Sequence, residues 1–256
     1  MKKIGIVLRY SNLKDGRDIL YLGDMIRRTI QKAGGFIIPI VQVQDVNYNS
    51  TRWNEFDELL EDEKEIVEEY LNMVDGVIFP GGFKLTPYDK YVLNRCVELD
   101  KRVLGICLGM QLLCSYDRNF KVEKNNSNIN HYQDNDDDLT HRIKIKKNTK
   151  LYEILKKEEI EVNSFHNYHV AEPTEGLVIN ATSEDNNVEG VELKDKTFIM
   201  GIQWHPEISY DFDENSKKII DYFIKVCGKW LYYYLRSTNI FEQTKSLIKK
   251  TINIII

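Results

Sequence analysis

One cysteine in this chain stands in a setting that suits nucleophilic catalysis. Cys107 lies in the run Gly-Ile-Cys-Leu-Gly, where an apolar, strand-like stretch passes into a helix-forming segment. This pattern is typical of a nucleophile elbow, a sharp strand-to-helix turn that raises one side chain above a sheet. The N-terminus of the following helix would favour the thiolate, which is the reactive form of cysteine. We therefore predict that Cys107 is a nucleophile and not a buried core thiol.

A thiol nucleophile needs a base and a group that orients the base. Of the five histidines, His205 follows an apolar run and precedes Pro206, which places it at the end of a strand. Glu207 lies two residues further on, where its carboxylate could accept a hydrogen bond from the imidazole. An isolated His-Pro pair would indicate a surface feature, but together with an elbow cysteine it predicts a triad of Cys107, His205 and Glu207.

An acyl-transfer site also needs donors for the oxyanion that forms when a thiolate attacks a carbonyl group. Pro80-Gly81-Gly82 follows a short apolar strand and offers backbone N–H groups without bulky side chains. The amide of Leu108, directly after the cysteine, is the second natural donor. We expect the amides of Gly82 and Leu108 to form the oxyanion hole.

Alternating strands and helices must bring these residues together. The first 115 residues contain strand patterns at 3–10, 36–41, 76–79 and 102–106 and helix patterns at 21–32, 61–73 and 88–99. This alternation predicts a parallel sheet with helices on both faces, whose carboxyl-end edge carries both the cysteine and the Pro-Gly-Gly turn. An Asn/Asp-rich stretch at 124–138 predicts an exposed loop. Later strand patterns lie at 141–145, 161–163, 177–183, 188–192 and 198–203, and a helix pattern lies at 214–226.

Composition excludes several classes of protein. The hydrophobic content of 42% is enough for a core, and a net charge of −5 without a basic stripe argues against nucleic-acid binding. The cysteines form no C-x-x-C pair, so we expect reduced thiols, no metal site and no cofactor. No run reaches the roughly 20 apolar residues of a membrane span, and the N-terminal apolar run is too short for a signal peptide. We expect a cytoplasmic protein without a membrane partner.

Three motifs, in order along the chain, resemble the class I glutamine amidotransferase superfamily. They are Pro-Gly-Gly, Gly-Ile-Cys-Leu-Gly-Met-Gln and Gln-Trp-His-Pro-Glu. The resemblance implies a flavodoxin-like α/β fold, a three-layer sandwich with a central, mostly parallel sheet and a small antiparallel extension. It also implies a Cys-His-Glu triad that attacks γ-glutamyl amides through a thioester. Residues 1–228 then form the hydrolase domain, and 229–256 form a C-terminal extension that we expect to be helical.

Further motifs, among them Val-Asn-Ser-Phe-His, look like the γ-glutamyl hydrolase branch, peptidase C26, which includes γ-glutamyl-γ-aminobutyrate hydrolases. The residues that this resemblance places at the substrate are Gly81, Gln111, Asn163, Ser164 and His166. Leu108 and Tyr168 stand where many hydrolases of this branch carry Arg and Gln. The resemblance therefore leaves the leaving group open.

We expect a cysteine hydrolase that cleaves the γ-glutamyl amide bond of a small γ-glutamyl compound, with a homodimer as one candidate assembly. The alternative is a glutaminase subunit that supplies ammonia to a docked synthase, for which free glutamine would be the substrate. A third interpretation, a non-catalytic binding protein on the same fold, is disfavoured by the complete triad.

Overall fold

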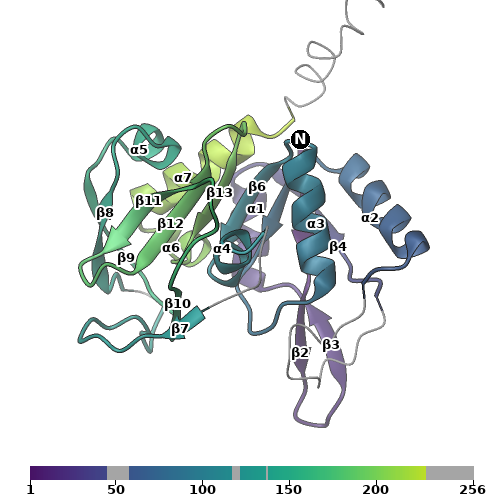
Figure 1. Ribbon diagram of the computed structural model, residues 1–256, viewed down its shortest axis with the longest axis horizontal. Helices are drawn as coiled ribbons and strands as arrows, with labels where there is room; N and C mark the ends of the chain where they lie inside the picture. Colours follow the sequence, from purple (N-terminus) through teal and green to yellow (C-terminus); the bar gives the residue numbers. More distant parts are fainter. Residues whose placement is uncertain (45–57, 117–121, 137, 229–256) are drawn as a thin grey trace, which may run out of the picture.

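A single mixed β-sheet forms the centre of the molecule (Figure 1). The structure, a computed structural model, describes residues 1–44, 58–116, 122–136 and 138–228. Within these ranges the sheet has nine strands in the order β4-β1-β5-β6-β13-β12-β11-β8-β9. The first five run parallel: β4 (Gly35–Ile40), β1 (Lys2–Val7), β5 (Gly76–Phe79), β6 (Arg102–Ile106) and β13 (Ile199–Ile202). The other four are antiparallel to their neighbours: β12 (Val188–Leu193), β11 (Leu177–Ser183), β8 (His141–Ile145) and β9 (Glu159–Val162).

The parallel half of the sheet has the strand order of a flavodoxin-like fold. Numbered along the chain, its strands lie in the order 2-1-3-4-5. Strands β5, β6 and β13 are buried at every position, because helices cover both faces of this half. The predicted α/β fold is confirmed, and the antiparallel strands extend the same sheet through the pairing of β12 with β13.

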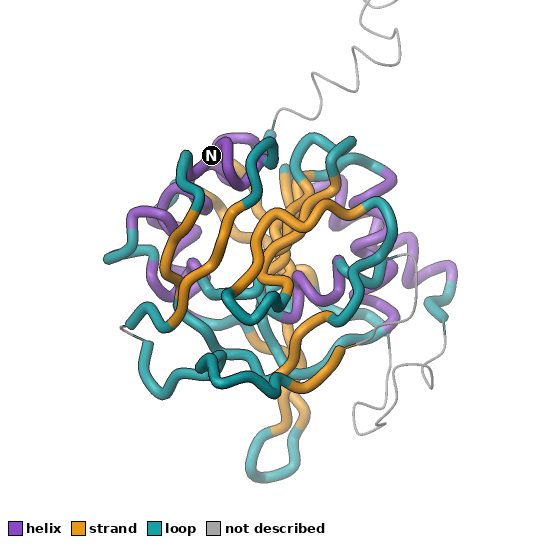
Figure 2. Tube along the Cα trace, turned by 60° about the vertical axis from the view of Figure 1, so that its left-hand side comes forward, coloured by secondary structure: helices purple, strands orange, loops and turns teal. Residues whose placement is uncertain are grey.

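Helices form the two outer layers (Figures 1 and 2). One face is covered by α1 (Asp24–Lys32), α5 (Lys150–Leu155) and α7 (Glu214–Val226). The other is covered by α2 (Glu61–Met73), α3 (Pro87–Glu98) and α4 (Leu108–Leu113). Each layer packs its own apolar cluster on the sheet, with Ile30 and Phe223 in the first and Val67 and Val92 in the second.

The first predicted strand is in fact two strands. After β1 the chain turns into β2 (Arg9–Asn12), which pairs antiparallel with β3 (Asp18–Tyr21) in a hairpin that projects from the sheet (Figure 1). Gly16 closes the hairpin with a φ of 86°, a conformation that glycine adopts without strain. Because residues 18–21 are engaged in this hairpin, the helix predicted from residue 21 begins only at Asp24.

The prediction of an exposed loop at 124–138 is wrong for part of that stretch. His131 and Gln133 are buried, because the backbone here is bonded to residues 164–166. The Gln133 amide donates to the carbonyl oxygen of Ser164 at 2.9 Å, and the His166 amide donates to that of His131 at 2.8 Å. Nearby, β7 (Val122–Lys124) pairs with β10 (Tyr168–Val170). These long-range pairings draw a polar stretch against the antiparallel half of the sheet.

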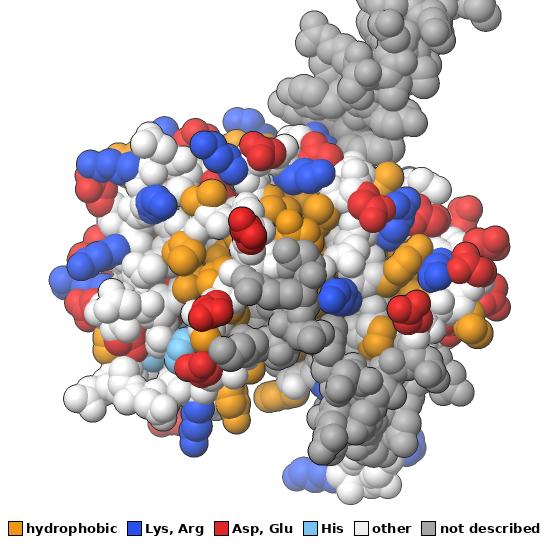
Figure 3. Space-filling view, viewed as in Figure 1, with side chains coloured by type: hydrophobic (Ala, Val, Ile, Leu, Met, Phe, Trp, Pro, Cys, Tyr) orange, Lys and Arg blue, Asp and Glu red, His pale blue; other side chains and the backbone are white. Residues whose placement is uncertain are grey.

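The surface carries charges of both signs. On most of the face shown in Figure 3, basic and acidic side chains of the described residues are interspersed, and acidic side chains gather at the end over α2. None of the helices in the described ranges is both long and apolar enough to cross a bilayer. All four cysteines are free, buried thiols. The predicted helical extension at 229–256 lies outside the described residues.

Candidate active site

Cys107 connects β6 to α4 in a strained backbone conformation. Its φ of 52° and ψ of −106° lie outside the regions that non-glycine residues favour. The chain thereby passes from strand to helix within one residue, and the thiol stands at the carboxyl edge of the sheet. The amide of Leu108 begins α4 and therefore has no carbonyl group of its own helix to bond. The elbow geometry predicted around Cys107 is present.

The glycines on both sides of Cys107 permit a close approach of helix and strands. A Cβ atom on Gly109 would lie 2.0 Å from the carbonyl oxygen of Phe79, at the end of β5. A Cβ atom on Gly105 would lie 2.6 Å from the carbonyl oxygen of Gly109. Both contacts are too short for any side chain, so only glycine lets α4 pack this closely. The spacing Gly-x-Cys-x-Gly therefore brings Cys107 next to the end of β5.

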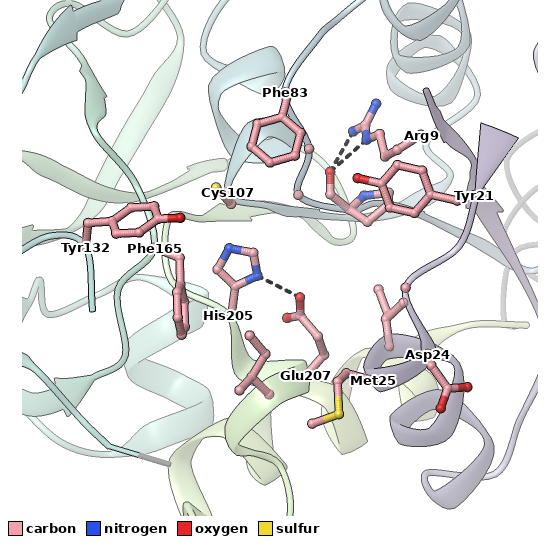
Figure 4. Close-up of a pocket in the computed structure, with 16 residues that line it drawn as sticks. Arg9, Tyr21, Asp24, Met25, Phe83, Cys107, Tyr132, Phe165, His205 and Glu207 are labelled. Carbon is pink, nitrogen blue, oxygen red and sulfur yellow. Dashed lines mark hydrogen bonds and ion pairs between the residues drawn. The ribbon is translucent and has the colours of Figure 1, made fainter. Parts of the chain in front are cut away.

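His205 lies beside Cys107 because β13, which precedes it, pairs with β6 (Figure 4). Pro206 begins the short helix α6 (Pro206–Ser209), which turns Glu207 towards the imidazole. His205 Nδ1 lies 2.8 Å from Glu207 Oε1, and this hydrogen bond fixes the orientation of the ring. A Cβ atom on Gly81 would lie 2.7 Å from His205 Cε1 and 3.5 Å from Cys107 Cβ, so the two side chains are neighbours. The ring thus lies between a carboxylate and a thiol.

Asn163 holds the backbone of His205 in place. Its side-chain oxygen accepts a hydrogen bond from the His205 amide at 2.8 Å, and its side-chain nitrogen donates to the His205 carbonyl oxygen at 2.8 Å. Asn163 is fully buried, so water does not compete for these bonds. The ring of Phe165 packs edge-on against the imidazole, with 5.6 Å between ring centroids. The position of the imidazole is therefore constrained from the backbone and from one face.

The surroundings of His205 favour its protonated form. Burial alone would lower the pKa of the imidazole, but the charges of Glu207 and Cys107 and the hydrogen bond to Glu207 raise this pKa well above its ordinary value. A protonated imidazole in turn stabilises a neighbouring thiolate. The arrangement can present a nucleophile and a proton donor to the same bound group.

A buried arginine holds the Pro80-Gly81-Gly82 turn next to this pair. Arg9 Nε and Nη2 donate to the carbonyl oxygen of Pro80 at 2.9 and 2.7 Å. Its Nη1 forms an ion pair with Asp89 Oδ1 at 2.5 Å, and Asp89 Oδ2 accepts from the amide of Thr86 at 2.8 Å, which caps α3. The turn, the start of β2 and the start of α3 are thus tied together.

Two cavities meet at Cys107. The first, of about 320 Å³, has an apolar rim formed by Tyr21, Met25, Phe83, Phe165 and Ile208 (Figure 4). The second, of about 310 Å³, is lined by Leu108, Gln111, Val122, His166 and Tyr168. Gly82 and Cys107 line both. The thiol therefore has room for a substrate group on either side.

Three of the residues predicted at the substrate lie on the cavity walls. Gly81 lines the first cavity, and a Cβ atom there would lie 2.7 Å from His205 Cε1, so the turn requires glycine at this point. Gln111 and His166 line the second cavity. The Gln111 side-chain nitrogen donates to the carbonyl oxygen of Tyr168 at 3.2 Å, which positions the amide.

The other two, Asn163 and Ser164, have no exposed surface and line neither cavity. Ser164 Oγ donates to the carbonyl oxygen of His131 at 2.8 Å, just as Asn163 bonds to the backbone of His205. The structure therefore places both side chains behind the cavity wall, where they connect neighbouring loops.

The sequence analysis missed Arg9 and Asp89. The signal for Arg9 was its place directly after the apolar run 4–8, near the sheet edge that also carries the elbow. The signal for Asp89 was its spacing of three residues from Thr86, which is that of a capping box. The contact between the two is long-range, since they lie 80 positions apart in the chain.

Comparison with known proteins gives the family. The family model of peptidase C26 matches residues 88–207, a range that includes Cys107, His205 and Glu207. A Schizosaccharomyces pombe protein provisionally named a glutamine amidotransferase is 34% identical over 201 residues, which cover 66% of this chain and 74% of that protein. This chain belongs to the class I glutamine amidotransferase-like superfamily.

Other proteins similar to this amidotransferase-like enzyme differ in size. The glutamine amidotransferase-like protein YvdE of Lactococcus lactis is 29% identical over 187 residues, which cover 63% of this chain and 78% of YvdE. The GMP synthase of Bacillus cereus is 32% identical over 163 residues, which cover 60% of this chain but only 28% of the synthase. A solved Thermoplasma acidophilum protein, provisionally named as one of the subunits of GMP synthase, matches with a TM-score of 0.60 and 17% identity over 91% of this chain and 98% of that one. That structural match supports the fold.

Proposed function

We propose that this amidotransferase-like enzyme is a cysteine hydrolase that cleaves the γ-glutamyl amide bond of a small γ-glutamyl compound. The observation that carries the proposal is the geometry at the elbow, where Cys107 lies beside His205 and Glu207 holds the far nitrogen of the ring at 2.8 Å. The raised pKa of His205 supports a protonated imidazole that can donate to the departing amine. Membership of the superfamily supports the same class of chemistry.

In this mechanism the Cys107 thiolate attacks the γ-carbonyl carbon, and the amides of Gly82 and Leu108 donate to the oxyanion. As the tetrahedral intermediate collapses, His205 transfers its proton to the departing amine, and a γ-glutamyl thioester remains on the cysteine. Neutral His205 then accepts a proton from water, whose oxygen attacks the thioester. Collapse of the second intermediate releases glutamate and restores the thiolate and imidazolium, while Glu207 orients the ring throughout.

The two cavities suit the two halves of such a substrate. We assign the γ-glutamyl group to the cavity lined by Gln111 and His166, and the amine to the cavity lined by Tyr21 and Met25. The rim of the amine cavity is mainly apolar and aromatic. Its two acidic residues are already engaged, Asp24 with Arg27 at 2.6 Å and Glu207 with His205 at 2.8 Å. These features favour a leaving amine with an apolar portion.

The test is glutamate release from a panel of γ-glutamyl amines, γ-glutamyl dipeptides and glutamine by the purified full chain. Cys107→Ala should abolish release. The control is Cys96→Ala, which removes a thiol whose pKa burial raises to about 12 and should keep full activity. Intact-mass spectrometry with a slow substrate should detect a γ-glutamyl adduct on the wild-type chain. Turnover by Cys107→Ala at the wild-type rate would overturn the proposal.

The assignment of the amine cavity has its own test. Met25 lines the first cavity but not the second and is 42% exposed, so Met25→Ala should fold normally. It should raise KM for substrates with long apolar amines and leave KM for γ-glutamyl methylamide unchanged, because only the longer amine reaches this side chain. An equal rise for both substrates would move the amine to the other cavity.

A glutaminase subunit that passes ammonia to a synthase is the second candidate. The similarity to a segment of the Bacillus cereus GMP synthase favours it, as does Leu108 directly after the nucleophile. Free glutamine would then be the substrate, and a docked synthase would activate the site. If the isolated chain hydrolyses a γ-glutamyl amine at least about tenfold faster than glutamine, the hydrolase is supported. Preference for glutamine with activation by a synthase would support the glutaminase.

A further inference from the structure

A second group of ionisable side chains lies buried away from the cysteine. We call it the histidine cluster: His131 in the loop before β8, His141 at the start of β8, His166 after β9, and Glu189 in β12. One potential ligand atom from each residue lies within 4.8 Å of all the others. The side chains are only 2%, 3%, 3% and 0% exposed, in that order. The proposed hydrolysis uses none of His131, His141 and Glu189.

The outer nitrogen of each imidazole is held by an acceptor. The contacts are His131 Nε2 to Asp185 Oδ2 at 2.9 Å, His166 Nδ1 to the Tyr168 carbonyl oxygen at 3.0 Å, and His141 Nδ1 to the Arg142 carbonyl oxygen at 3.3 Å. Carbonyl and carboxylate oxygens only accept, so each outer nitrogen carries the proton. Each inner nitrogen of a neutral ring then presents a lone pair to the centre of the cluster.

Two amide groups also approach the outer nitrogens. Asn187 Nδ2 lies 3.3 Å from His131 Nε2, and Asn125 Nδ2 lies 3.4 Å from His166 Nδ1. Each amide has a shorter bond elsewhere, to Asp185 Oδ2 at 3.1 Å and to the His166 carbonyl oxygen at 2.9 Å respectively. The acceptor contacts therefore decide the tautomers.

At the centre of the cluster, three imidazole nitrogens that can only accept hydrogen bonds face a carboxylate that can also only accept them. The inner nitrogens of His131, His141 and His166 lie 3.5, 3.9 and 3.5 Å from Glu189 Oε1. None of the three nitrogens, and neither oxygen of Glu189, has a hydrogen-bond partner among the described residues. A fully buried carboxylate without donors is costly, so the cluster requires a cation.

A metal ion meets this requirement better than a proton does. One proton could join only one imidazole to the carboxylate and would leave the other lone pairs unpaired. A tetrahedral ion with bonds of about 2.1 Å separates its ligand atoms by roughly 3.4 Å. The spacings of 3.5, 3.5 and 3.9 Å to Glu189 Oε1 are close to that value. Three imidazoles with their far nitrogens hydrogen-bonded, plus one carboxylate, are a donor set typical of zinc.

We propose that His131 Nδ1, His141 Nε2, His166 Nε2 and Glu189 bind one Zn²⁺ ion in a closed, structural site. All four positions are filled by protein, and the site is buried, so the ion would not bind substrate. It would tie the loop around residue 131 and the segment 163–166 to β8 and β12. Because that segment also contacts His205, the ion would stabilise the wall of the second cavity.

The first test is the metal content of the full chain, unfolded in a chelator and refolded with or without Zn²⁺. We expect about one zinc ion per wild-type chain and a higher melting temperature for the zinc-loaded protein. Glu189→Gln should lose the ion. The matched control is Glu192→Gln, in the same strand, whose buried carboxylate already accepts from Asn180 Nδ2 at 3.0 Å and from the Lys150 amide at 2.8 Å. It should keep the ion.

The second test uses the response of stability to the metal. Refolding with Zn²⁺ should raise the melting temperature of the wild type above that of the chelator-treated chain, and it should leave the melting temperature of Glu189→Gln unchanged, because the variant lacks one ligand. If only protons held the cluster together, Zn²⁺ would not change the melting temperature of either chain. That result would overturn the proposal. A wild-type chain that holds less than about a tenth of an equivalent after refolding with Zn²⁺ would also overturn it, even if the variant fails to fold.

Discussion

The Cys107 site and the histidine cluster are built from the same residue types in opposite arrangements. At the first, one imidazole has Glu207 on one nitrogen and lies beside a thiol that lines two cavities. In the second, three imidazoles have their outer nitrogens bonded, and their inner nitrogens converge on a carboxylate that has no exposed surface. The first arrangement lets a proton pass between the ring and an incoming group. The second holds three lone pairs around one point, which suits a metal ion.

The segment 163–166 connects the two regions. Asn163 bonds to the backbone of His205, and Phe165 packs against its ring, whereas Ser164 and His166 bond to and face the histidine cluster. Alternate residues of one short segment therefore serve different centres, because successive side chains of an extended chain point to opposite sides. The two regions share this segment as a wall, but we expect a substitution in one region to change hydrolysis or zinc binding without changing the other.

The largest expected effect is that of Cys107→Ala. It should lower γ-glutamyl hydrolysis by at least about 10⁴-fold, because the nucleophile is lost. Zinc content and melting temperature should stay close to those of the wild type. Steady-state assays, metal analysis and thermal unfolding check this separation. Loss of zinc in this variant would show that the two regions are not independent.

Glu207→Gln should lower kcat by about 10³–10⁴-fold, because the imidazole loses its orienting anion. The charge of Glu207 helps to raise the pKa of His205, so this pKa should fall in the variant. The alkaline limb of the kcat/KM profile, where the imidazolium loses its proton, should then move to lower pH. If the alkaline limb stays at the same pH in the variant, that limb reports the titration of a group other than His205.

The free energy of unfolding should also depend on the protonation of His205. Because folding raises the pKa of His205, protonation of this residue stabilises the native state, and it does so fully at a pH below the pKa of about 6.5 in the unfolded chain. That contribution is lost as the pH rises through the pKa of His205 in the folded chain. Denaturant titrations across this window should show a weaker pH dependence in Glu207→Gln than in the wild type.

A change at the edge of the histidine cluster should have a smaller effect, on metal affinity alone. Asp185 accepts from His131 Nε2, so Asp185→Asn should weaken zinc binding by about 10–100-fold, the usual cost of losing such an outer partner. Hydrolysis at saturating zinc should remain at the wild-type level. Competition titration with a chromophoric chelator measures the affinity, and an unchanged Kd would remove Asp185 from the site.

The smallest effect is expected at Arg9, which positions the turn beside Cys107. Lys in its place keeps the charge opposite Asp89 but cannot make both bonds to the Pro80 carbonyl oxygen. Arg9→Lys should lower kcat by about tenfold, less than the roughly 10²–10³-fold cost of removing an oxyanion donor, and should leave KM unchanged. A rise in KM at constant kcat would indicate a role in substrate binding.

Local sequence patterns placed the parallel half of the fold well. The helix at 61–73 and the strands at 76–79 and 102–106 have the predicted bounds, because an amphipathic helix and a doubly buried strand each carry their own periodicity. The elements missed were short or depended on distant partners. Helix α5 has only six residues, and β7 pairs with β10 more than 40 residues away. Neither leaves a strong local pattern.

By itself, the sequence determined the candidate nucleophile, its histidine and its carboxylate, and with them the superfamily. These features are local: the elbow needs glycines at fixed spacing around Cys107, and His205 and Glu207 are two residues apart. Only the tertiary structure decided that His131, His141, His166 and Glu189 converge, and that Arg9 reaches the Pro80 turn. Those contacts join separate strands and loops, so they depend on strand order and register, which no spacing along the chain encodes.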